Sequence, residues 1–363
     1  MGMEWFEQTD EIEERLVRRA NAARIPIGGT FELSPACNMR CEMCYARMDT
    51  AQIRAQGGLM TGERWMAIAE ELREAGCIFL LLTGGEPLLY PDFMEVYTGL
   101  QEMGFILTVN TNGTLMDETW VDFFAVHPPR RINITLYGAD EAVYESLCHY
   151  GEGYERTIRA IRMLRERGLS VKMNVSLTPK NKVQFAKFYE LAQSLGIPVE
   201  VDSYMFPFCR ERAEYDETVR LTPEECADYY MQTLYRQKPS GFQAYLRDAG
   251  VILSGGCFPG HDCMICRAGT SSFWINWKGN LSPCFAMQQD VVSLAEHSFT
   301  EAWELLGERI TRVRLSDKCS NCAWQQLCPS CAGRALSETG RADGTPEYLC
   351  SFMEYIKKGF HKA

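Results

Sequence analysis

The chain has 363 residues, 46% of them hydrophobic, enough for one large domain or two ordinary domains with a substantial core. The net charge is −11 and there is no basic tract, which argues against binding to a nucleic-acid backbone. No run of about 18 apolar residues and no apolar signal core are visible, so we expect neither a membrane span nor an export signal.

Cysteine is unusually frequent in the chain, with 16 residues. In a protein that stays in a reducing compartment, cysteines at this density indicate metal or redox chemistry rather than disulfides. A cytoplasmic and anaerobic protein is the simplest interpretation.

The N-terminal segment has helical spacing over residues 9–23, and we expect residues 1–24 to form a helix. A strand is expected next, over Ile27–Leu33, and it leads into a loop with Cys37, Cys41 and Cys44. Three thiolates at C-x3-C-x2-C spacing can bind three corners of a cubane iron–sulfur cluster, leaving the fourth iron open. Catalytic metal sites keep such an open position, and no other cysteine stands nearby in the sequence. The alternative is a zinc knuckle with a distant fourth ligand.

From residue 25 onward, strand-like and helix-like segments alternate, and Gly76, Gly104, Gly168 and Gly196 follow several of the helical patterns. Six such units in series predict a parallel α/β sheet, although periodicity leaves open whether it is flat or curled into a barrel. The expected strands are Ile27–Leu33, Ile78–Thr83, Phe105–Thr111, Ile132–Leu136, Val171–Leu177 and Val199–Met205, with helices near 62–75, 91–103, 117–125, 153–167 and 183–194.

Unusual polar and glycine residues gather where these strands end. Function is expected beyond the carboxyl ends of parallel strands. Candidates at these positions are the cysteine loop, Gly84–Pro87, Asn110–Gly113, Leu136–Gly138, Asn174, Asp202 and Tyr204.

After about residue 210 the pattern changes, and helices near 222–237 and 242–252 lead into a cysteine-rich tail. The segment between Cys266 and Cys284 is typical of a β-hairpin that turns at Lys278-Gly279. The clustered thiols of the tail suffice for two four-cysteine sites, and a closed zinc ribbon over 319–331 is the alternative. Cys77, Cys148, Cys209 and Cys226 lie outside these arrays and are expected to be ordinary buried thiols.

Two motifs together carry a family resemblance. C-x3-C-x2-C with Met43 before its last cysteine, followed about forty residues on by Thr83-Gly-Gly-Glu-Pro87, resembles the signature of the radical S-adenosylmethionine (SAM) superfamily. The resemblance implies a partial (β/α)6 barrel over 25–207, with a SAM-binding [4Fe–4S] cluster on Cys37, Cys41 and Cys44. It also implies SAM contacts from Tyr45, Gly84, Gly85, Glu86, Thr135 and Asn174.

Three of these assignments have structural alternatives. Glu86 is equally suited to bind backbone N–H groups of its own loop, and Thr135 and Asn174 to be satisfied inside the barrel. Gly84 and Gly85 are expected to let the backbone approach the methionine part of SAM closely.

The tail resembles the SPASM extension of peptide-modifying radical SAM enzymes, in Cys266-Arg-Ala-Gly269 and in Gly279…Pro283-Cys284. We therefore expect a helical bridge over 208–254 and a SPASM domain over 255–363 with two auxiliary [4Fe–4S] clusters. Pro329-Ser330 departs from the family, which usually has three residues at this point. The implied ligands are Cys319, Cys322, Cys328 and Cys350 for the outer cluster, and Cys266, Cys284, Cys331 and either Cys263 or Cys257 for the inner one.

The resemblance implies an enzyme that cleaves SAM reductively and abstracts hydrogen from a peptide or small protein, giving a cross-link, an oxidation or an epimerisation. It implies a flavodoxin or ferredoxin as electron donor. Alternatives are maturation of a peptide-derived or porphyrin-type cofactor, a sulfatase-type maturase, and a non-enzymatic multi-cluster electron carrier. Phe285 argues against the sulfatase type, which has an aspartate after this cysteine.

Overall fold

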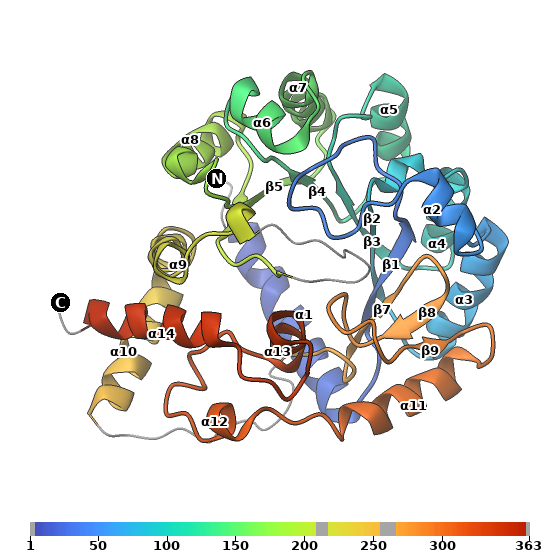
Figure 1. The fold of residues 1–363 in the computed structure, drawn as a ribbon. Coiled ribbons are helices and arrows are strands. Elements are labelled where there is room, and N and C mark those ends of the chain that lie inside the picture. The colour runs from blue at the N-terminus through green and yellow to red at the C-terminus, as the bar shows by residue number, and fades with distance from the viewer. Residues whose placement is uncertain (1–3, 208–216, 255–265, 361–363) are drawn as a thin grey trace. The chain divides into compact units, whose positions relative to one another are not determined.

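The computed structural model describes residues 4–207, 217–254 and 266–360 (Figure 1). Cys209, Cys257 and Cys263 lie outside the described residues. The chain divides into two compact units, each built from separate stretches of sequence. The first unit comprises Met1–Ala36, Met48–Val109 and Cys266–Arg312, and the second comprises Cys37–Arg47, Asn110–Ile265 and Val313–Ala363.

The first unit is organised by parallel strands. Strand β1 pairs in parallel with β2 on one side and with β7 on the other, and β2 pairs with β3. Strands β8 and β9 then continue from β7 as antiparallel neighbours. The strands are β1 (Gly28–Ser34), β2 (Phe79–Gly84), β3 (Ile106–Thr111), β7 (Ser272–Ile275), β8 (Asn280–Ser282) and β9 (Val292–Ser293), and the helices are α1 (Glu4–Ala23), α2 (Thr50–Ala55), α3 (Gly62–Glu74), α4 (Phe93–Glu102) and α11 (Phe299–Ile310), with a 3-10 turn at Pro87–Leu89.

The second unit holds three further parallel strands and the C-terminal helices. Strand β5 lies between β4 and β6. Its strands are β4 (Arg131–Thr135), β5 (Val171–Ser176) and β6 (Val199–Asp202), and its helices are α5 (Glu118–Val126), α6 (Glu141–Cys148), α7 (Gly153–Glu166), α8 (Phe185–Leu195), α9 (Pro223–Gln237), α10 (Pro239–Leu253), α12 (Asp317–Ser320), α13 (Ala332–Thr339) and α14 (Glu347–Phe360), with 3-10 turns at Lys182–Gln184 and Glu217–Val219.

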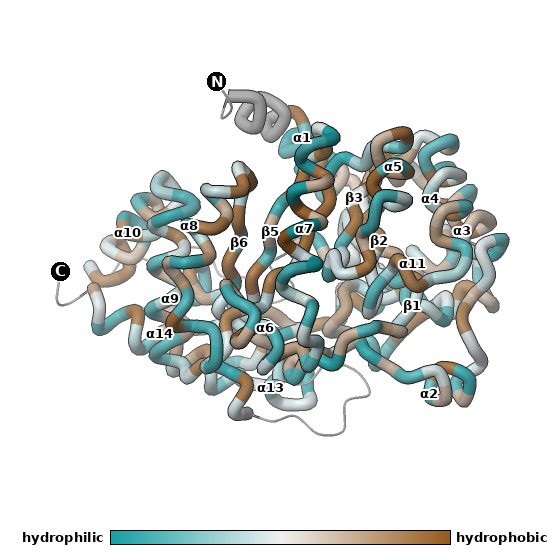
Figure 2. Tube along the Cα trace, turned by 90° about the horizontal axis from the view of Figure 1, so that it is seen from above, coloured by the Kyte–Doolittle hydropathy of each residue, from teal (hydrophilic) through white to brown (hydrophobic). Residues whose placement is uncertain are grey.

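One face of β4 and β5 is apolar and the other is polar, because successive side chains of a strand point to opposite faces. The apolar face is buried and carries Ile132, Ile134, Val171, Met173 and Val175. The alternate positions are polar and carry Arg131, Asn133, Thr135, Lys172, Asn174 and Ser176. Hydropathy along the trace shows the apolar stretches of β5 and β6 (Figure 2). The polar face is therefore available for hydrogen bonding to a ligand.

The expected α/β class with a parallel sheet is confirmed, and the first five strands match their predictions to within one residue at either end. The hairpin is also confirmed, with Gly279 in its turn at φ +77°. Strand β6 is shorter than predicted and ends at Asp202 rather than Met205. The backbone N–H of Tyr204 donates to Asp202 Oδ1 at 2.9 Å, so a side chain takes the donor that a strand ladder would need.

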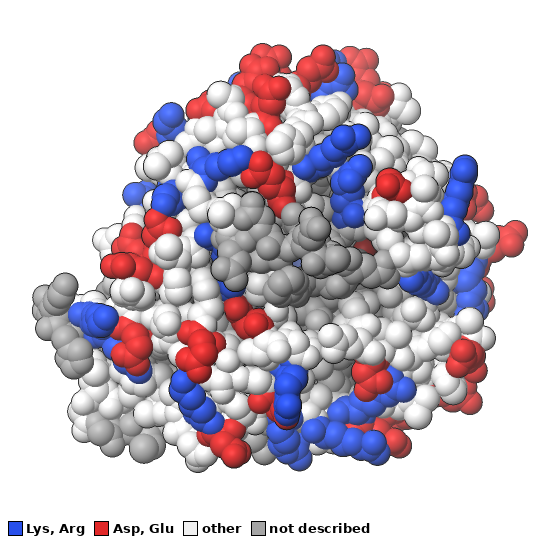
Figure 3. Space-filling view, viewed as in Figure 1, with Lys and Arg blue, Asp and Glu red and all other residues white. Residues whose placement is uncertain are grey.

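None of the described helices combines the length and the apolar character needed to cross a membrane. Basic and acidic side chains are interspersed on the face drawn in Figure 3.

Candidate active site

The loop with Cys37, Cys41 and Cys44 belongs to the second unit, where the end of α6 holds it in place. The N–H of Arg40 donates to the carbonyl of Cys148 at 3.0 Å, and the N–H of Glu42 donates to Leu147 at 3.0 Å. These two backbone bonds fix the chain on both sides of Cys41. These bonds hold the loop against the end of α6.

Amide groups surround the sulfur atoms of this loop. The backbone N–H of Met39 donates to Cys37 Sγ at 3.4 Å, and the N–H of Arg47 donates to Cys44 Sγ at 3.3 Å. Asn112 Nδ2 lies 3.7 Å from Cys37 Sγ. Hydrogen bonds of this kind stabilise a thiolate and tune a metal that it binds. The donor set therefore fits cysteines that act as ligands.

A polar network from the end of β3 orients the first part of the loop. Asn112 Nδ2 donates to Asn38 Oδ1 at 3.0 Å, and Asn38 Nδ2 donates to Thr114 Oγ1 at 2.8 Å. The hydroxyl of Thr114 donates to Asn112 Oδ1 at 2.7 Å, which closes the network. The sequence marked 110–113 as functional because it follows a strand, but the partnership with Asn38 spans 74 residues and no spacing indicates it.

Cys148 lies beside Cys41, although the sequence placed no further cysteine near the loop. It is the last residue of α6 and is fully buried, as expected for an ordinary thiol. The hydrogen bond between the two thiols, together with burial, raises the pKa of Cys41 well above its usual value. The hypothesis of an open fourth position therefore needs a direct test of Cys148.

We expect Cys148→Ala to keep the iron bound to this loop and to lower SAM cleavage by about tenfold at most, as for loss of a group that only supports a metal ligand. Iron analysis and the rate of 5′-deoxyadenosine formation measure the effect. Cys226→Ala, which also removes a fully buried thiol of the same unit, is the control. Loss of all iron from the loop in Cys148→Ala alone would make Cys148 a fourth ligand and contradict the open site.

The Gly84–Pro87 element belongs to the first unit, where it is held against the residues that directly precede Cys37. The N–H of Gly85 donates to Ser34 at 2.8 Å, and the N–H of Glu86 donates to Ala36 at 2.8 Å. A Cβ on Gly84 would lie 2.1 Å from the Ser34 carbonyl oxygen, and one on Gly85 would lie 2.5 Å from that of Ala36. Both glycines are thus needed for close approach to the chain's own backbone, whatever they contribute to SAM.

Glu86 is fully buried and caps the 3-10 turn that follows it. Its Oε1 accepts from the N–H of Leu88 at 3.2 Å. This contact supports the structural interpretation of Glu86, in which the carboxylate binds backbone N–H groups of its own loop.

Thr135 and Asn174 are direct neighbours across β4 and β5 on the polar face. Asn174 Oδ1 is buried and has no hydrogen-bond partner among the described residues. A buried acceptor without a donor is costly, so this atom fits a ligand hydroxyl or amine. Tyr45 follows the last cysteine of the loop and is 38% exposed, leaving much of its ring accessible.

The cysteines of the tail are divided between the units. Cys266 and Cys284 belong to the first unit, and Cys331 belongs to the second, where it precedes α13. The other two candidate ligands of the inner cluster, Cys263 and Cys257, lie outside the residues that the structure describes.

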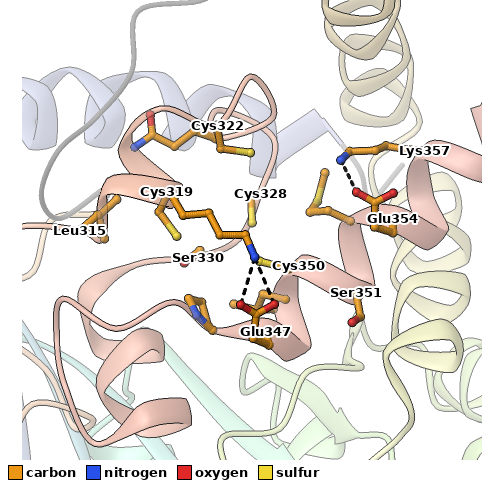
Figure 4. A pocket seen from close by; sticks show the side chains of 15 residues that line it. Leu315, Cys319, Cys322, Cys328, Ser330, Glu347, Cys350, Ser351, Glu354 and Lys357 are labelled. Atoms are coloured by element: carbon orange, nitrogen blue, oxygen red, sulfur yellow. Dashed lines mark hydrogen bonds and ion pairs between the residues drawn. The ribbon is translucent and has the colours of Figure 1, made fainter.

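Four cysteines of the second unit line one cavity of about 330 Å³, which we call the tail cavity (Figure 4). Across the described part of the chain, no three His, Cys, Asp or Glu side chains are placed around a single metal ion. Sulfurs spread around a cavity suit a group of several atoms better than one zinc ion. The cavity is lined by Cys319, Cys322, Cys328 and Cys350, together with Leu315, Lys318, Gln325, Ser330, Pro346, Glu347, Leu349, Ser351, Met353, Glu354 and Lys357.

Residues 31–192 match the family model of the radical SAM superfamily. Over 349 residues the chain is 24% identical to an AdoMet-dependent heme synthase of Methanosarcina barkeri, covering 90% of this chain and 95% of that protein. Among solved structures, native anSMEcpe with bound AdoMet matches with a TM-score of 0.69 and 18% identity, over 93% of this chain and 98% of that one. SuiB of Streptococcus suis bound to the precursor peptide SuiA matches with a TM-score of 0.65 and 18% identity, over 94% and 80%. These likenesses establish the fold over nearly the whole chain.

Proposed function

This chain belongs to the radical SAM superfamily through residues 31–192, and we propose that it is an enzyme that modifies a peptide or small protein after hydrogen abstraction. The observation that carries the proposal is the cysteine loop, whose three thiols are partly buried and in which backbone N–H groups donate to Cys37 and Cys44. The buried acceptor Asn174 Oδ1 on the polar strand face adds a group for SAM. The fold likeness to SuiB, whose structure is titled as bound to a precursor peptide, supports a peptide as substrate.

Cys37, Cys41 and Cys44 would hold a [4Fe–4S] cluster that, with SAM, supplies a 5′-deoxyadenosyl radical for abstraction of a substrate hydrogen. The chain keeps these thiolates in place through the N–H groups of Met39 and Arg47. One-electron chemistry of this kind needs an external donor such as flavodoxin or ferredoxin.

SAM itself would be held by residues from both sequence motifs. Asn174 Oδ1 offers an acceptor for a ribose hydroxyl, and the neighbouring Thr135 offers a hydroxyl beside it. Tyr45 would pack on the adenine ring. Gly84 and Gly85 would bring backbone groups to the methionine part, and Glu86 would keep their loop in shape.

The tail, residues 255–363, would carry two auxiliary clusters and would follow the barrel of residues 25–207 and the bridge of 208–254 in the sequence. We place the outer cluster in the tail cavity. The inner one would use Cys266, Cys284 and Cys331, with Cys263 or Cys257 as the fourth ligand.

Phe285 argues against a sulfatase-type reaction among those open to radical SAM enzymes. A sulfatase-type maturase would have an aspartate at this position, which directly follows Cys284. Phe285 instead packs against Trp274, with ring centroids 5.8 Å apart. An apolar ring cannot accept a proton, so a base for oxidation would have to come from elsewhere.

A second candidate is modification of a tetrapyrrole. The M. barkeri relative aligns over nine-tenths of both chains and is named a heme synthase, which favours this candidate.

The two candidates are separated by supplying each substrate to the reconstituted enzyme with SAM and dithionite under anaerobic conditions. We expect peptides encoded beside its gene to raise 5′-deoxyadenosine formation and to lose two hydrogens or take up one solvent deuterium, as mass spectrometry measures. If only iron tetrapyrrole precursors of haem raise it, with loss of carbon dioxide, the second candidate replaces the first. If neither substrate is altered, the peptide proposal fails for those peptides.

A further inference from the structure

Ser330 carries a buried hydroxyl without a partner. Its side chain is more than nine-tenths buried, with 8% of its surface exposed, and its Oγ has no hydrogen-bond partner in the described part of the chain. A buried hydroxyl that is left without a partner destabilises the folded state, so folded proteins seldom keep one. Ser330 also belongs to the two-residue stretch, Pro329-Ser330, that departs from the family pattern.

Ser330 is one of the residues that line the tail cavity, together with the four cysteines (Figure 4). The charged groups of the same wall are already engaged with each other. Lys318 Nζ lies 3.0 Å from Glu347 Oε1, and Lys357 Nζ lies 2.6 Å from Glu354 Oε1. Because no described residue pairs with the Ser330 hydroxyl, a group bound in the cavity is the partner that its position offers.

Hydrogen bonds to backbone groups hold the loop around Ser330 in place. The N–H of Cys328 donates to Trp324 at 2.9 Å, and the N–H of Ser330 donates to Cys328 Sγ. Arg334 Nη1 donates to the carbonyl of Pro329, while its guanidinium stacks 4.4 Å from the ring centroid of Tyr204. Ser330 is therefore fixed from both sides.

We propose that the Ser330 hydroxyl donates a hydrogen bond to a sulfur of the cluster in the tail cavity and so raises the reduction potential of that cluster. The inference rests on the proposed function, which puts the cluster there. Reduction adds negative charge to the sulfurs, and a donor aimed at them stabilises the reduced state more than the oxidised one. Ser330 is thus a positioning residue for electron transfer in the tail, in addition to the four ligands.

The test uses the full chain, reconstituted anaerobically, with iron analysis and an EPR-monitored redox titration. Cys319→Ala combined with Cys350→Ala, which leaves only two of the four cysteines, first identifies by difference the signal of the tail cavity. Ser330→Ala is compared with Ser351→Ala, the other serine of the wall, which is exposed so that water satisfies it. Ser330→Thr keeps a hydroxyl at the same position.

We expect Ser330→Ala to bind the same amount of iron and to shift the midpoint potential of this one cluster to a more negative value. Ser351→Ala and Ser330→Thr should stay close to wild type. A different result would also support the contact. If Ser330→Ala assembles no cluster in the cavity while Ser330→Thr does, the cluster needs the hydroxyl in order to assemble.

An unchanged midpoint potential in Ser330→Ala, with iron retained, would overturn the inference alone. So would failure of both Ser330 variants to assemble the cluster, because the shape of the loop would then matter rather than the hydroxyl. If replacing Cys319 and Cys350 together removes no iron, the cavity holds no cluster, and the tail assignment fails together with the inference.

Discussion

Replacing Cys41 by alanine is expected to abolish 5′-deoxyadenosine formation and to remove about four of roughly twelve iron atoms per chain. With Cys41 gone, only Cys37 and Cys44 remain in the loop, and two thiolates do not hold a cubane cluster. The remaining iron should stay in the tail, whose cysteines do not include Cys41. Iron and sulfide analysis with an anaerobic SAM-cleavage assay measures both effects.

Cys77→Ala is the matched control for Cys41→Ala. Cys77 is buried, and its Sγ lies 3.7 Å from the Phe79 carbonyl, away from any cysteine array. Its replacement should leave iron content and SAM cleavage unchanged. Two results would contradict the radical mechanism and favour a metal-binding scaffold. One is full SAM cleavage in Cys41→Ala, and the other is tightly bound zinc in place of iron in the wild-type protein.

The regular part of the fold follows from local physics and was predictable. Strands and helices alternate with clear periodicity, and Gly76, Gly104, Gly168 and Gly196 all adopt positive φ as they leave a helix. The C-x3-C-x2-C spacing likewise identifies the loop by itself, because three ligands within eight residues need no information about distant contacts.

Short elements were missed for a physical reason. Helices α2 and α6 have six and eight residues, too few for a helical period to stand out from chance. Tertiary contacts compensate for this shortness: α6 uses its last carbonyl groups to hold the cysteine loop. An element of this kind becomes visible only once its partner is in place.

The supporting residues of the site depend on contacts between distant segments, which spacing does not record. Asn38 meets Thr114 across 76 residues, and Cys148 meets Cys41 across the whole of β2, β3 and β4. Ser330 was noted only as a departure from the family pattern. Its unsatisfied hydroxyl could be recognised only after its burial was known.

Arg220→Met is expected to lower the free energy of unfolding by about 3–5 kcal/mol, because it leaves a buried carboxylate without its partner. Arg220 and Glu338 form an ion pair whose side chains are only 8% and 9% exposed. Glu338 also accepts from the Tyr204 hydroxyl at 2.7 Å, and the Arg220 guanidinium lies 3.5 Å from the ring centroid of Tyr348. Urea unfolding of variants with equal iron content measures the change.

Arg156→Met is the control for Arg220→Met, since its ion pair with Glu152 joins side chains that are 49% and 73% exposed. Breaking that exposed pair should lower the free energy of unfolding far less than the loss of Arg220 does. Arg220→Met combined with Glu338→Leu should recover much of the loss, because no charge then remains buried without a partner. Equal destabilisation by Arg220→Met and Arg156→Met would contradict the argument from burial.

If that argument holds, Arg220→Met should also loosen the loop of Ser330. Glu338 and Arg334 both belong to α13, and Arg334 holds the carbonyl of Pro329.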